Sequence, residues 1–336
     1  MSDISPETLW QIDDKALMRL LDAKALAPKT KRIRFYVPSF MYYKTSYYRS
    51  SPRDFPTVSI TGKGCALKCK HCGGKVLETM YPAVTPEELL KLCKALKDGW
   101  ASGCLISGGC LPDGSVPIEK FLGAIERVKR DLGLVVFVHT GIIRSDTARR
   151  LRLAGVDAAL IDIIGSDETI KEIYNLKVNV KDYENSLMAL HDARIAFVPH
   201  VIVGLHYGQL KGEFQALKLI SKYKPSALVV IAFMPIHGTE MANVQPPKPI
   251  DIARVLAIAR LMFPTVPLAL GCMRPKGRHR VETDILAVKA GVDAIAFPTE
   301  EAISFAEKEG YKKSFSSSCC AQIYSDALKG LEAASY

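Results

Sequence analysis

Residues 85–107 read TPEELLKLCKALKDGWASGCLIS, and they contain one helix and one strand of a pattern that recurs along the chain. Thr85 is a helix N-cap residue, Pro86 suits the first helical position, and Glu88 follows three residues after the cap. Apolar side chains then recur on one face of the helix, at Leu89, Leu92, Cys93 and Leu96. The apolar run 103–107 that follows predicts a buried strand.

This alternation extends through most of the chain. Eight apolar runs predict strands, at 58–61, 103–107, 134–139, 158–162, 195–203, 227–233, 267–270 and 294–297. Further helical patterns lie between them, at 118–132, 213–223, 250–262, 281–290 and 299–309. Strands that alternate with helices at this spacing form parallel βαβ units. Eight such units predict an α/β fold, a closed (β/α)8 barrel of the TIM type.

We assign the barrel to residues 57–310 of the 336-residue chain. Residues 1–56 are predicted to form an N-terminal extension that packs on the barrel, with a helix near residues 6–21 and an aromatic-rich stretch after it. Residues 311–336 are predicted to form a C-terminal tail over the barrel mouth. No linker is long enough to separate two domains.

The composition is that of a globular protein, because 48% of the residues are hydrophobic and 24% are charged. Lys and Arg exceed Asp and Glu by 45 to 35, and the net charge of +10 favours acidic partners. The longest apolar stretches are far shorter than the roughly 20 residues that a membrane-spanning helix needs. The N-terminus also lacks the pattern of a secretory signal. We therefore expect a cytoplasmic protein with no membrane partner.

Nine cysteines in such a chain indicate a reducing compartment, where clustered cysteines often hold a metal. Three of them lie in the loop after the first predicted strand, which reads GKGCALKCKHCGG at 62–74. Cys65, Cys69 and Cys72 have the spacing C-x3-C-x2-C and can direct three thiolates to one centre. A structural zinc needs a fourth ligand, for which only His71 is near. An iron–sulfur cluster with three protein thiolates instead leaves one iron open.

This motif, directly after the first strand of a βα barrel, resembles the signature of the radical S-adenosylmethionine (SAM) superfamily. The resemblance implies that Cys65, Cys69 and Cys72 hold a 4Fe–4S cluster whose open iron chelates SAM. One electron then cleaves SAM to methionine and a 5′-deoxyadenosyl radical, which abstracts hydrogen from an unactivated carbon. The resemblance further implies that the backbone of His71 approaches the adenine.

Other strand ends carry residues that the resemblance assigns to SAM. Ser107, Gly108 and Gly109 look like the family's Gly-Gly-Glu motif, but Cys110 stands where the acidic residue is expected. Asp162 resembles an acidic residue that contacts the ribose, although a helix cap for the following turn explains it equally well. The strip that includes Val203 and Gly204 is similar to the family's apolar contact with adenine. His139 and His200 are expected to be hydrogen-bonded core residues.

The resemblance extends over about residues 58–298 and is greatest to the biotin synthase-like branch, in particular to archaeal members that include the two-component lipoyl synthases. Bacterial lipoyl synthase has a second three-cysteine motif before its radical motif, whereas this chain has no cysteine before Cys65. We therefore expect an auxiliary iron–sulfur cluster elsewhere. Its candidate ligands are Cys110, Cys272, Cys319 and Cys320, with Arg274 beside it, since this branch tolerates an arginine ligand.

These expectations together describe a radical SAM enzyme that inserts sulfur into a protein-bound octanoyl chain. The expected partners are an acidic lipoyl-carrier protein, a second radical SAM subunit and a reduced ferredoxin-type electron donor. Another biotin synthase-like reaction, either carbon-skeleton rearrangement or cofactor maturation, is an alternative. A nucleic-acid-modifying enzyme would carry an RNA-binding module, which is not visible, and a non-enzymatic zinc module would bind zinc without iron.

Overall fold

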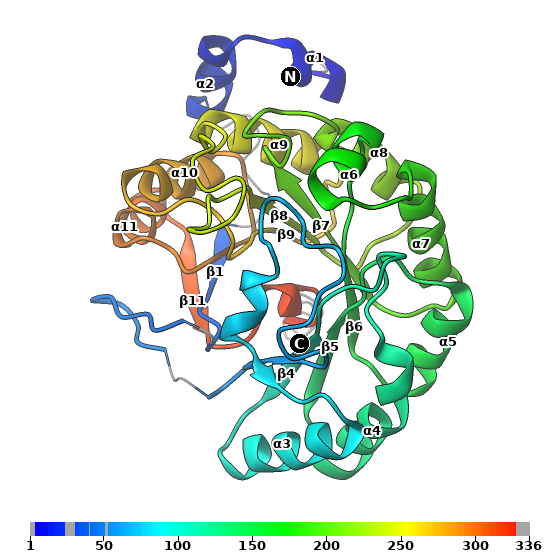
Figure 1. Ribbon diagram of the computed structural model, residues 1–336. Coiled ribbons are helices and arrows are strands. Elements are labelled where there is room, and N and C mark those ends of the chain that lie inside the picture. Colours follow the sequence, from blue (N-terminus) through cyan, green and yellow to red (C-terminus); the bar gives the residue numbers. More distant parts are fainter. Residues whose placement is uncertain (1–3, 24–30, 40, 51–52, 327–336) are drawn as a thin grey trace.

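One parallel sheet of eleven strands forms the centre of the fold, in the order β11-β1-β10-β9-β8-β7-β6-β5-β4-β2-β3. The computed structural model describes residues 4–23, 31–39, 41–50 and 53–326. The strands curl around a central space, and the helices lie outside them (Figure 1). The strands are β1 Arg32–Tyr36, β2 Thr57–Ser59, β3 Tyr81–Pro82, β4 Gly103–Ser107, β5 Val135–His139, β6 Ala158–Asp162, β7 Phe197–Val203, β8 Leu228–Ala232, β9 Leu268–Leu270, β10 Ala294–Ala296 and β11 Lys312–Ser316.

The predicted α/β barrel architecture is confirmed, and each of the eight predicted strands coincides with an observed one, from β2 and β4 through to β10. The sheet is open rather than closed, because its two ends, β3 and β11, are not neighbours. In a closed barrel β10 would pair with β2, the first barrel strand. It pairs instead with β1, and β11 pairs with the other side of β1. The carboxyl ends of all these parallel strands face the same way.

Helices follow most strands and cover the outside of the barrel. They are α1 Pro6–Gln11, α2 Asp14–Asp22, α3 Pro86–Asp98, α4 Leu122–Arg127, α5 Ser145–Leu153, α6 Asp167–Tyr174, α7 Val180–Asp192, α8 Glu213–Ser221, α9 Pro249–Met262, α10 Arg278–Lys289 and α11 Glu300–Lys308. The predicted capping box of α3 is present, with Thr85 and Glu88 bonded to each other's backbone N–H. Among the described residues, no helix is long and apolar enough to cross a membrane.

The core has two layers because successive strand residues point to opposite faces of the sheet. In β5, Val136 and Val138 belong to the outer core beneath the helices, whereas Phe137 lies in the inner core of the barrel. In β6, Ile161 is in the outer core and Leu160 in the inner one. Side chains on the inner face near the carboxyl ends are therefore the ones that can meet a ligand.

The N-terminal residues contribute both a cover and a strand. The predicted helix near residues 6–21 is two helices, α1 and α2, that pack on α9. Arg254 of α9 fixes them by donating hydrogen bonds to Leu9 O at 2.8 Å, Ile12 O at 2.7 Å and Asp14 at 2.8 Å. Part of the predicted extension 1–56 is thus the strand β1, which belongs to the sheet itself.

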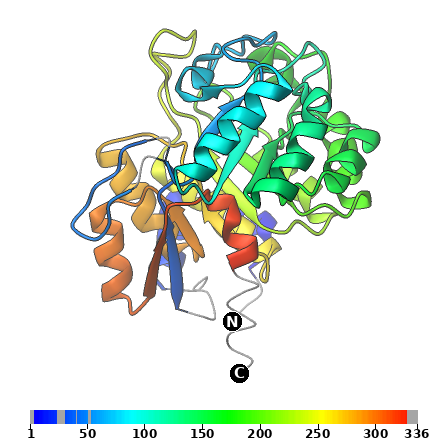
Figure 2. The ribbon, with the colours of Figure 1, turned by 90° about the horizontal axis from the view of Figure 1, so that it is seen from below.

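The described part of the C-terminal tail lies inside the barrel rather than over its mouth. After β11 the chain enters the ring of strands, as Figures 1 and 2 show from two sides. The short helix η4 (Cys320–Gln322) contacts β8 and β10, and Cys320 and Ala321 are buried in the inner core. Tyr324 then donates a 2.7 Å hydrogen bond to Asp157 O, just before β6 begins. The tail fills the barrel because the inward strand positions here are small, such as Ala227, Ala269 and Ala294.

Candidate functional site

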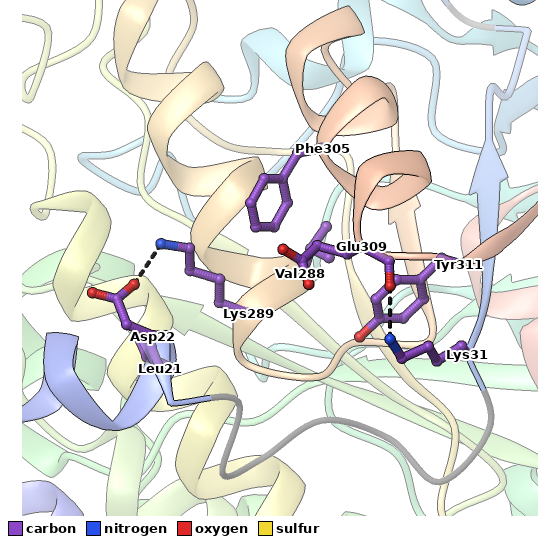
Figure 3. Close-up of a pocket in the computed structure, with 8 residues that line it drawn as sticks. All are labelled: Leu21, Asp22, Lys31, Val288, Lys289, Phe305, Glu309 and Tyr311. Carbon is purple, nitrogen blue, oxygen red and sulfur yellow. Dashed lines mark hydrogen bonds and ion pairs between the residues drawn. The ribbon is translucent and has the colours of Figure 1, made fainter.

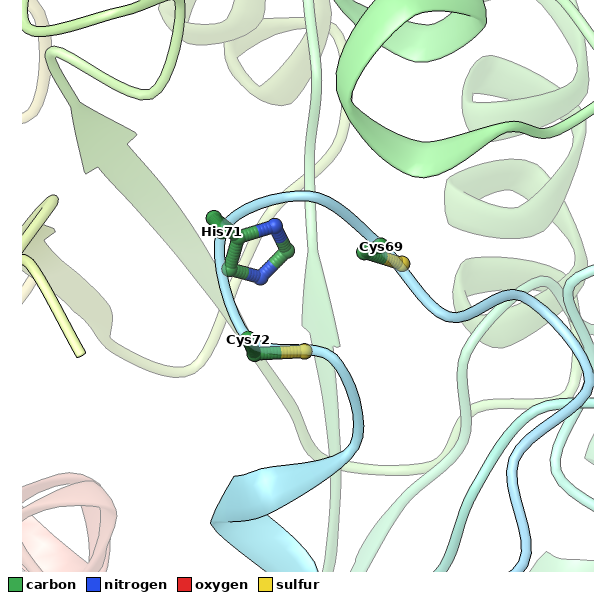
Figure 4. Close-up of side chains that lie close together, drawn as sticks. All are labelled: Cys69, His71 and Cys72. Carbon is green, nitrogen blue, oxygen red and sulfur yellow. The ribbon is translucent and has the colours of Figure 1, made fainter. Parts of the chain in front are cut away.

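The cysteine loop follows β2 and forms a tight turn at the carboxyl edge of the sheet. Gly73 N donates to Cys69 O at 2.7 Å, and Cys72 N donates to the same oxygen at 3.1 Å. The turn brings the sulfur atoms of Cys69 and Cys72 and a ring nitrogen of His71 within 4.8 Å of one another. Figure 4 shows these three side chains projecting from one turn of the loop.

The third cysteine of the motif, Cys65, is positioned by the loop after β4. A Cβ atom at Gly109 would lie 2.6 Å from the Cα and Cβ of Cys65 and 2.0 Å from Gly64 O, so only glycine fits. Ala66 N also donates to Cys110 O at 2.8 Å, and Gly109 N donates to Thr61 Oγ1 at 2.7 Å. The Ser107–Gly108–Gly109 segment therefore packs on the cysteine loop, and its contact with SAM stays a prediction.

The electrostatics of the loop favour a thiolate at Cys72. The hydrogen bond with Cys69 lowers the pKa of the Cys72 thiol to about 4, with a further contribution from His71, against the burial that would raise it. The same hydrogen bond, together with burial, raises the pKa of Cys69. Thiolates are the form in which cysteine binds a metal. The donor set is therefore suited to iron–sulfur ligation.

Two buried polar atoms beside the loop have no hydrogen-bond partner. They are Nδ1 of His71 and Oη of Tyr174, from α6. The two rings are neighbours, with centroids 5.1 Å apart, and Cys69 Sγ lies 3.6 Å from Tyr174 O. Buried polar groups are rarely left unpaired unless a ligand or water completes them. Together with the three cysteines, they fit a bound group that carries polar atoms. Tyr174 was not predicted from the sequence, where it reads as an ordinary helix residue.

Asp162, at the end of β6, lies in the barrel interior with two histidines. Its Oδ1 atom is 3.5 Å from Nε2 of His139, and His200 lies beside both. Asp162 does not cap the following helix, because Ser166 accepts the hydrogen bond from Thr169 N. Burial would raise the pKa of Asp162, but His139 and its neighbours hold it below its usual value. Burial lowers the pKa of His200 to about 4, so this imidazole is neutral.

The end of β7 is held by a carboxyl group that the sequence analysis missed. Gly204 adopts φ 72° and donates its N–H to Glu213 Oε1 at 2.8 Å. Glu213 begins α8 and is 4% exposed, and burial raises its pKa to about 7. Its other oxygen, Oε2, has no partner. Glu213 thus fixes the predicted adenine-contacting residues Val203 and Gly204, whose contact with adenine itself stays a prediction.

The four cysteines predicted as auxiliary ligands fall into two places. Cys272, after β9, lies close enough to Cys319 for their charges to interact, and Cys320 neighbours both. Burial, then Cys319, raises the pKa of Cys272 to about 11. Cys110 instead faces the cysteine loop, because its charged neighbours include Cys65 and Cys72. Three of the candidates are thus electrostatic neighbours in the barrel interior, although their sulfur atoms do not form a close ligand group among the described residues, and the fourth lies beside the radical motif.

Arg274 is not available as a ligand, which corrects the expectation for this residue. Its guanidinium is fully buried and donates to Asp284 at 2.7 Å, Gly271 O at 2.7 Å and Phe297 O at 3.2 Å. It therefore fixes the loop that carries Cys272. Arg280, on α10, is the neighbouring cation that also acts on Cys272.

A surface cavity of about 200 Å³ lies between α2, α10 and α11 (Figure 3). Ion pairs and hydrogen bonds border it, with Lys289 to Asp22 at 2.6 Å and Lys31 to Glu309 O at 2.8 Å. Lys31 and Tyr311 directly precede β1 and β11, so this cavity lies at the amino edge of the sheet. It is remote from the strand ends that carry the cysteines.

Comparison with known proteins agrees with this geometry. Residues 59–211 match the family model of the radical SAM superfamily. Two curated relatives are biotin synthases: that of Prochlorococcus marinus (strain MIT 9211) is 27% identical over 253 residues, covering 71% of this chain and 73% of the relative. That of Zymomonas mobilis is 28% identical over 301 residues, covering 86% and 84%. Residues 59–211 of this chain are therefore a radical SAM domain.

Among radical SAM proteins, this chain is similar to biotin synthases over most of its length. Its cofactors are accordingly a 4Fe–4S cluster and SAM. Solved structures show the same fold at low identity. Methylornithine synthase (PylB) aligns with a TM-score of 0.63 and 16% identity over 93% of this chain and 94% of that one. The FeFe-hydrogenase maturase HydG from Carboxydothermus hydrogenoformans aligns with a TM-score of 0.64 and 15% identity, over 92% and 75%.

Proposed function

We propose that this radical SAM enzyme inserts sulfur into an unactivated C–H bond of a protein-bound octanoyl chain, as a component of a lipoyl synthase. The observation that carries the proposal is that Cys272, Cys319 and Cys320 are electrostatic neighbours beside the inner core of the barrel. Sulfur insertion requires a sulfur source held near the substrate, and thiolate-bound iron–sulfur clusters contain sulfide. The resemblance to biotin synthases favours the same class of chemistry.

Cys65, Cys69 and Cys72 are the residues that would hold the 4Fe–4S cluster. When bound, the cluster and SAM supply the 5′-deoxyadenosyl radical that abstracts hydrogen from carbon. Cys72 enters this site already biased toward the thiolate. Gly109 keeps the backbone after β4 against Cys65, and the partnerless atoms of His71 and Tyr174 provide polar contacts for the bound SAM.

Cys272, Cys319 and Cys320 are the proposed ligands of an auxiliary cluster. Burial raises the pKa of Cys272, and the hydrogen bond between Cys319 and Cys320 raises the pKa of Cys320 and lowers that of Cys319. A charged thiolate in a dry interior is costly unless it is paired. A cluster or the nearby Arg280 can provide the compensating positive charge. Cys110 is left out of this ligand set because it faces the cysteine loop. All nine cysteines are free thiols in the structure, which is consistent with the reducing, cytoplasmic location that we propose.

The proposed substrate is carried by an acidic protein domain, and electrons come from a reduced ferredoxin-type donor. The net charge of +10 supports both partners, because opposite charges accelerate encounter. A second radical SAM subunit is part of the same proposal. If docking is electrostatic, turnover of a carrier-bound octanoyl chain falls steeply as salt rises. Equal turnover of free octanoate, or no dependence on salt, would contradict the carrier.

The decisive experiment compares cysteine variants after anaerobic reconstitution. Cys272→Ala should still cleave SAM to 5′-deoxyadenosine, yet it should form no C–S bond with carrier-bound octanoyl-lysine. The Cys65/Cys69/Cys72→Ala variant should retain iron and sulfide for about one cluster. Cys93→Ala is the matched control, since Cys93 is buried on α3 in the outer core. Normal thiolated product from Cys272→Ala would overturn the proposal and favour rearrangement chemistry.

A further inference from the structure

His139, Asp162 and His200 form a cluster of ligand atoms that neither the radical motif nor the auxiliary cysteines use. One ligand atom from each lies within 4.8 Å of both others. We propose that these three residues bind a mononuclear divalent metal ion, Zn²⁺ or Fe²⁺, in the barrel interior. The inference goes beyond the proposed sulfur insertion and does not depend on it.

The sheet register places the three residues side by side. His139 ends β5, Asp162 ends β6, and His200 lies within β7. Asp162 is the direct register partner of His200, and His139 pairs with Leu160, two residues before Asp162. Because side chains alternate along a strand, His139, Asp162 and His200 all point to the inner face. Three rigid neighbouring strands therefore present one ligand each.

The distances suit a metal better than a simple ion pair. Nε2 of His139 lies 3.5 Å from Oδ1 of Asp162, which is longer than a good N–H···O hydrogen bond. Two ligands on one tetrahedral zinc ion lie roughly 3.4 Å apart, since each bond is about 2.0–2.1 Å long. Since all three ligand atoms lie within 4.8 Å of one another, a contraction of at most about 1.4 Å at the widest pair would close the site. Small rotations of the two imidazoles can supply this movement.

His200 is oriented as a metal ligand usually is. Its Nδ1 atom lies 3.1 Å from Val198 O, so Nδ1–H donates to this carbonyl and Nε2 carries the lone pair. A backbone acceptor on the second ring nitrogen is the common way in which proteins fix a ligating histidine. The imidazole rings of His139 and His200 are tilted by 51° to each other, with centroids 5.7 Å apart, and the strand of Asp162 lies between theirs.

Two imidazoles and one carboxylate select the class of metal. This donor set suits Zn²⁺ and Fe²⁺, and three protein ligands leave at least one position open. Cys319 is an electrostatic neighbour of His139, so the site lies near one of the proposed auxiliary cysteines. A bound ion there can hold a polar group of the substrate.

The test measures zinc binding, because zinc can be distinguished from the iron of the clusters. The full chain, reconstituted with its clusters, is titrated with Zn²⁺ against a chromophoric chelator, and bound zinc is examined by X-ray absorption at the zinc edge. We expect one zinc per chain with nitrogen and oxygen ligands at about 2.0–2.1 Å. One added sulfur at about 2.3 Å would mean that Cys319 completes the same site, which supports the metal site and removes Cys319 from the ligands of the auxiliary cluster. A shell of sulfur alone, or no bound zinc, would overturn it.

Variants separate this site from structural and SAM-binding roles. His200→Gln and Asp162→Asn should each weaken zinc binding more than about 100-fold while circular dichroism stays unchanged. His191→Ala is the matched control, because His191 lies exposed near the end of α7 and belongs to none of the candidate metal-binding groups of the described residues. If Asp162→Asn lowers SAM affinity and leaves zinc binding intact, Asp162 contacts the ribose and the metal site is refuted.

Discussion

The two cysteine regions of this enzyme are built in different ways. Cys65, Cys69 and Cys72 lie within one loop, whereas Cys272 comes from the end of β9 and Cys319 from the tail. In each region one hydrogen bond between cysteines lowers the pKa of one thiol, that of Cys72 to about 4 in the loop and that of Cys319 in the interior. The difference lies in how the cysteines are brought together: local contacts suffice within the loop, whereas the interior cysteines depend on tertiary structure.

The largest expected effect tests the loop directly. Replacing Cys65, Cys69 or Cys72 by Ala should abolish reductive cleavage of SAM, because the open-site cluster needs all three thiolates. The measurement is 5′-deoxyadenosine formed under dithionite. Cys110→Ala, next to the loop but outside the motif, should still form it. Substantial 5′-deoxyadenosine from any of the three motif variants would show that the cysteine loop does not hold the cluster that cleaves SAM.

A second test removes the buried ion pair between Arg274 and Asp284, which fixes the loop that carries Cys272. Arg274→Met should destabilise the protein by about 3–5 kcal/mol, because Asp284 is then left as a buried, unpaired charge. Urea unfolding gives this difference. The double variant Arg274→Met/Asp284→Leu should recover part of the loss, and Lys181→Met, which breaks an exposed ion pair, should leave the midpoint nearly unchanged. Equal midpoints for the single and double variants would show that the buried pair does not hold the Cys272 loop.

A third test disturbs the contact between Gly109 and Cys65, which positions the cysteine loop. Gly109→Ala places a methyl group 2.6 Å from Cys65, so the two loops must separate, at a cost of about 1–3 kcal/mol. Cluster content, measured as iron and sulfide per chain, should fall with it. Gly123→Ala is the matched control, since a Cβ there has nothing within 4 Å. Full cluster loading in Gly109→Ala would mean that Cys65 does not depend on this contact.

The same contrast explains how far the sequence could be interpreted. The cysteine loop and the eight central strands follow from local spacing and periodicity, so they were predicted. β1 was missed because its partner β10 lies more than 250 residues away along the chain. The place of Cys110 depends on which loop faces the end of β4. The place of Arg274 depends on its ion pair with Asp284 of α10. No local sequence pattern encodes either contact. Buried partners such as Tyr174 and Glu213 have no sequence signal until the fold brings them together.

The smallest expected effect concerns the end of β7, where the carboxyl group of Glu213 accepts a hydrogen bond from Gly204 N. Burial raises the pKa of Glu213 to about 7 in the folded protein, while the unfolded chain titrates near 4.5. Between these values the folded state retains a proton that the unfolded state has lost. Stability from this group is therefore complete below pH of about 4.5 and decreases as pH rises to about 7, by at most about 1.4 kcal/mol per pH unit.

Glu213→Gln isolates this contribution, because the amide oxygen can still accept the hydrogen bond from Gly204 N but no longer titrates. Urea midpoints of the wild type and the variant, measured between pH 5 and 8, should diverge in favour of the variant up to about pH 7 and then run parallel. All other titrating groups are common to both chains, so they cancel in the difference. Profiles that stay parallel over the whole range would show that Glu213 ionises as it does in the unfolded chain, and that Gly204 N donates to a charged carboxylate at neutral pH.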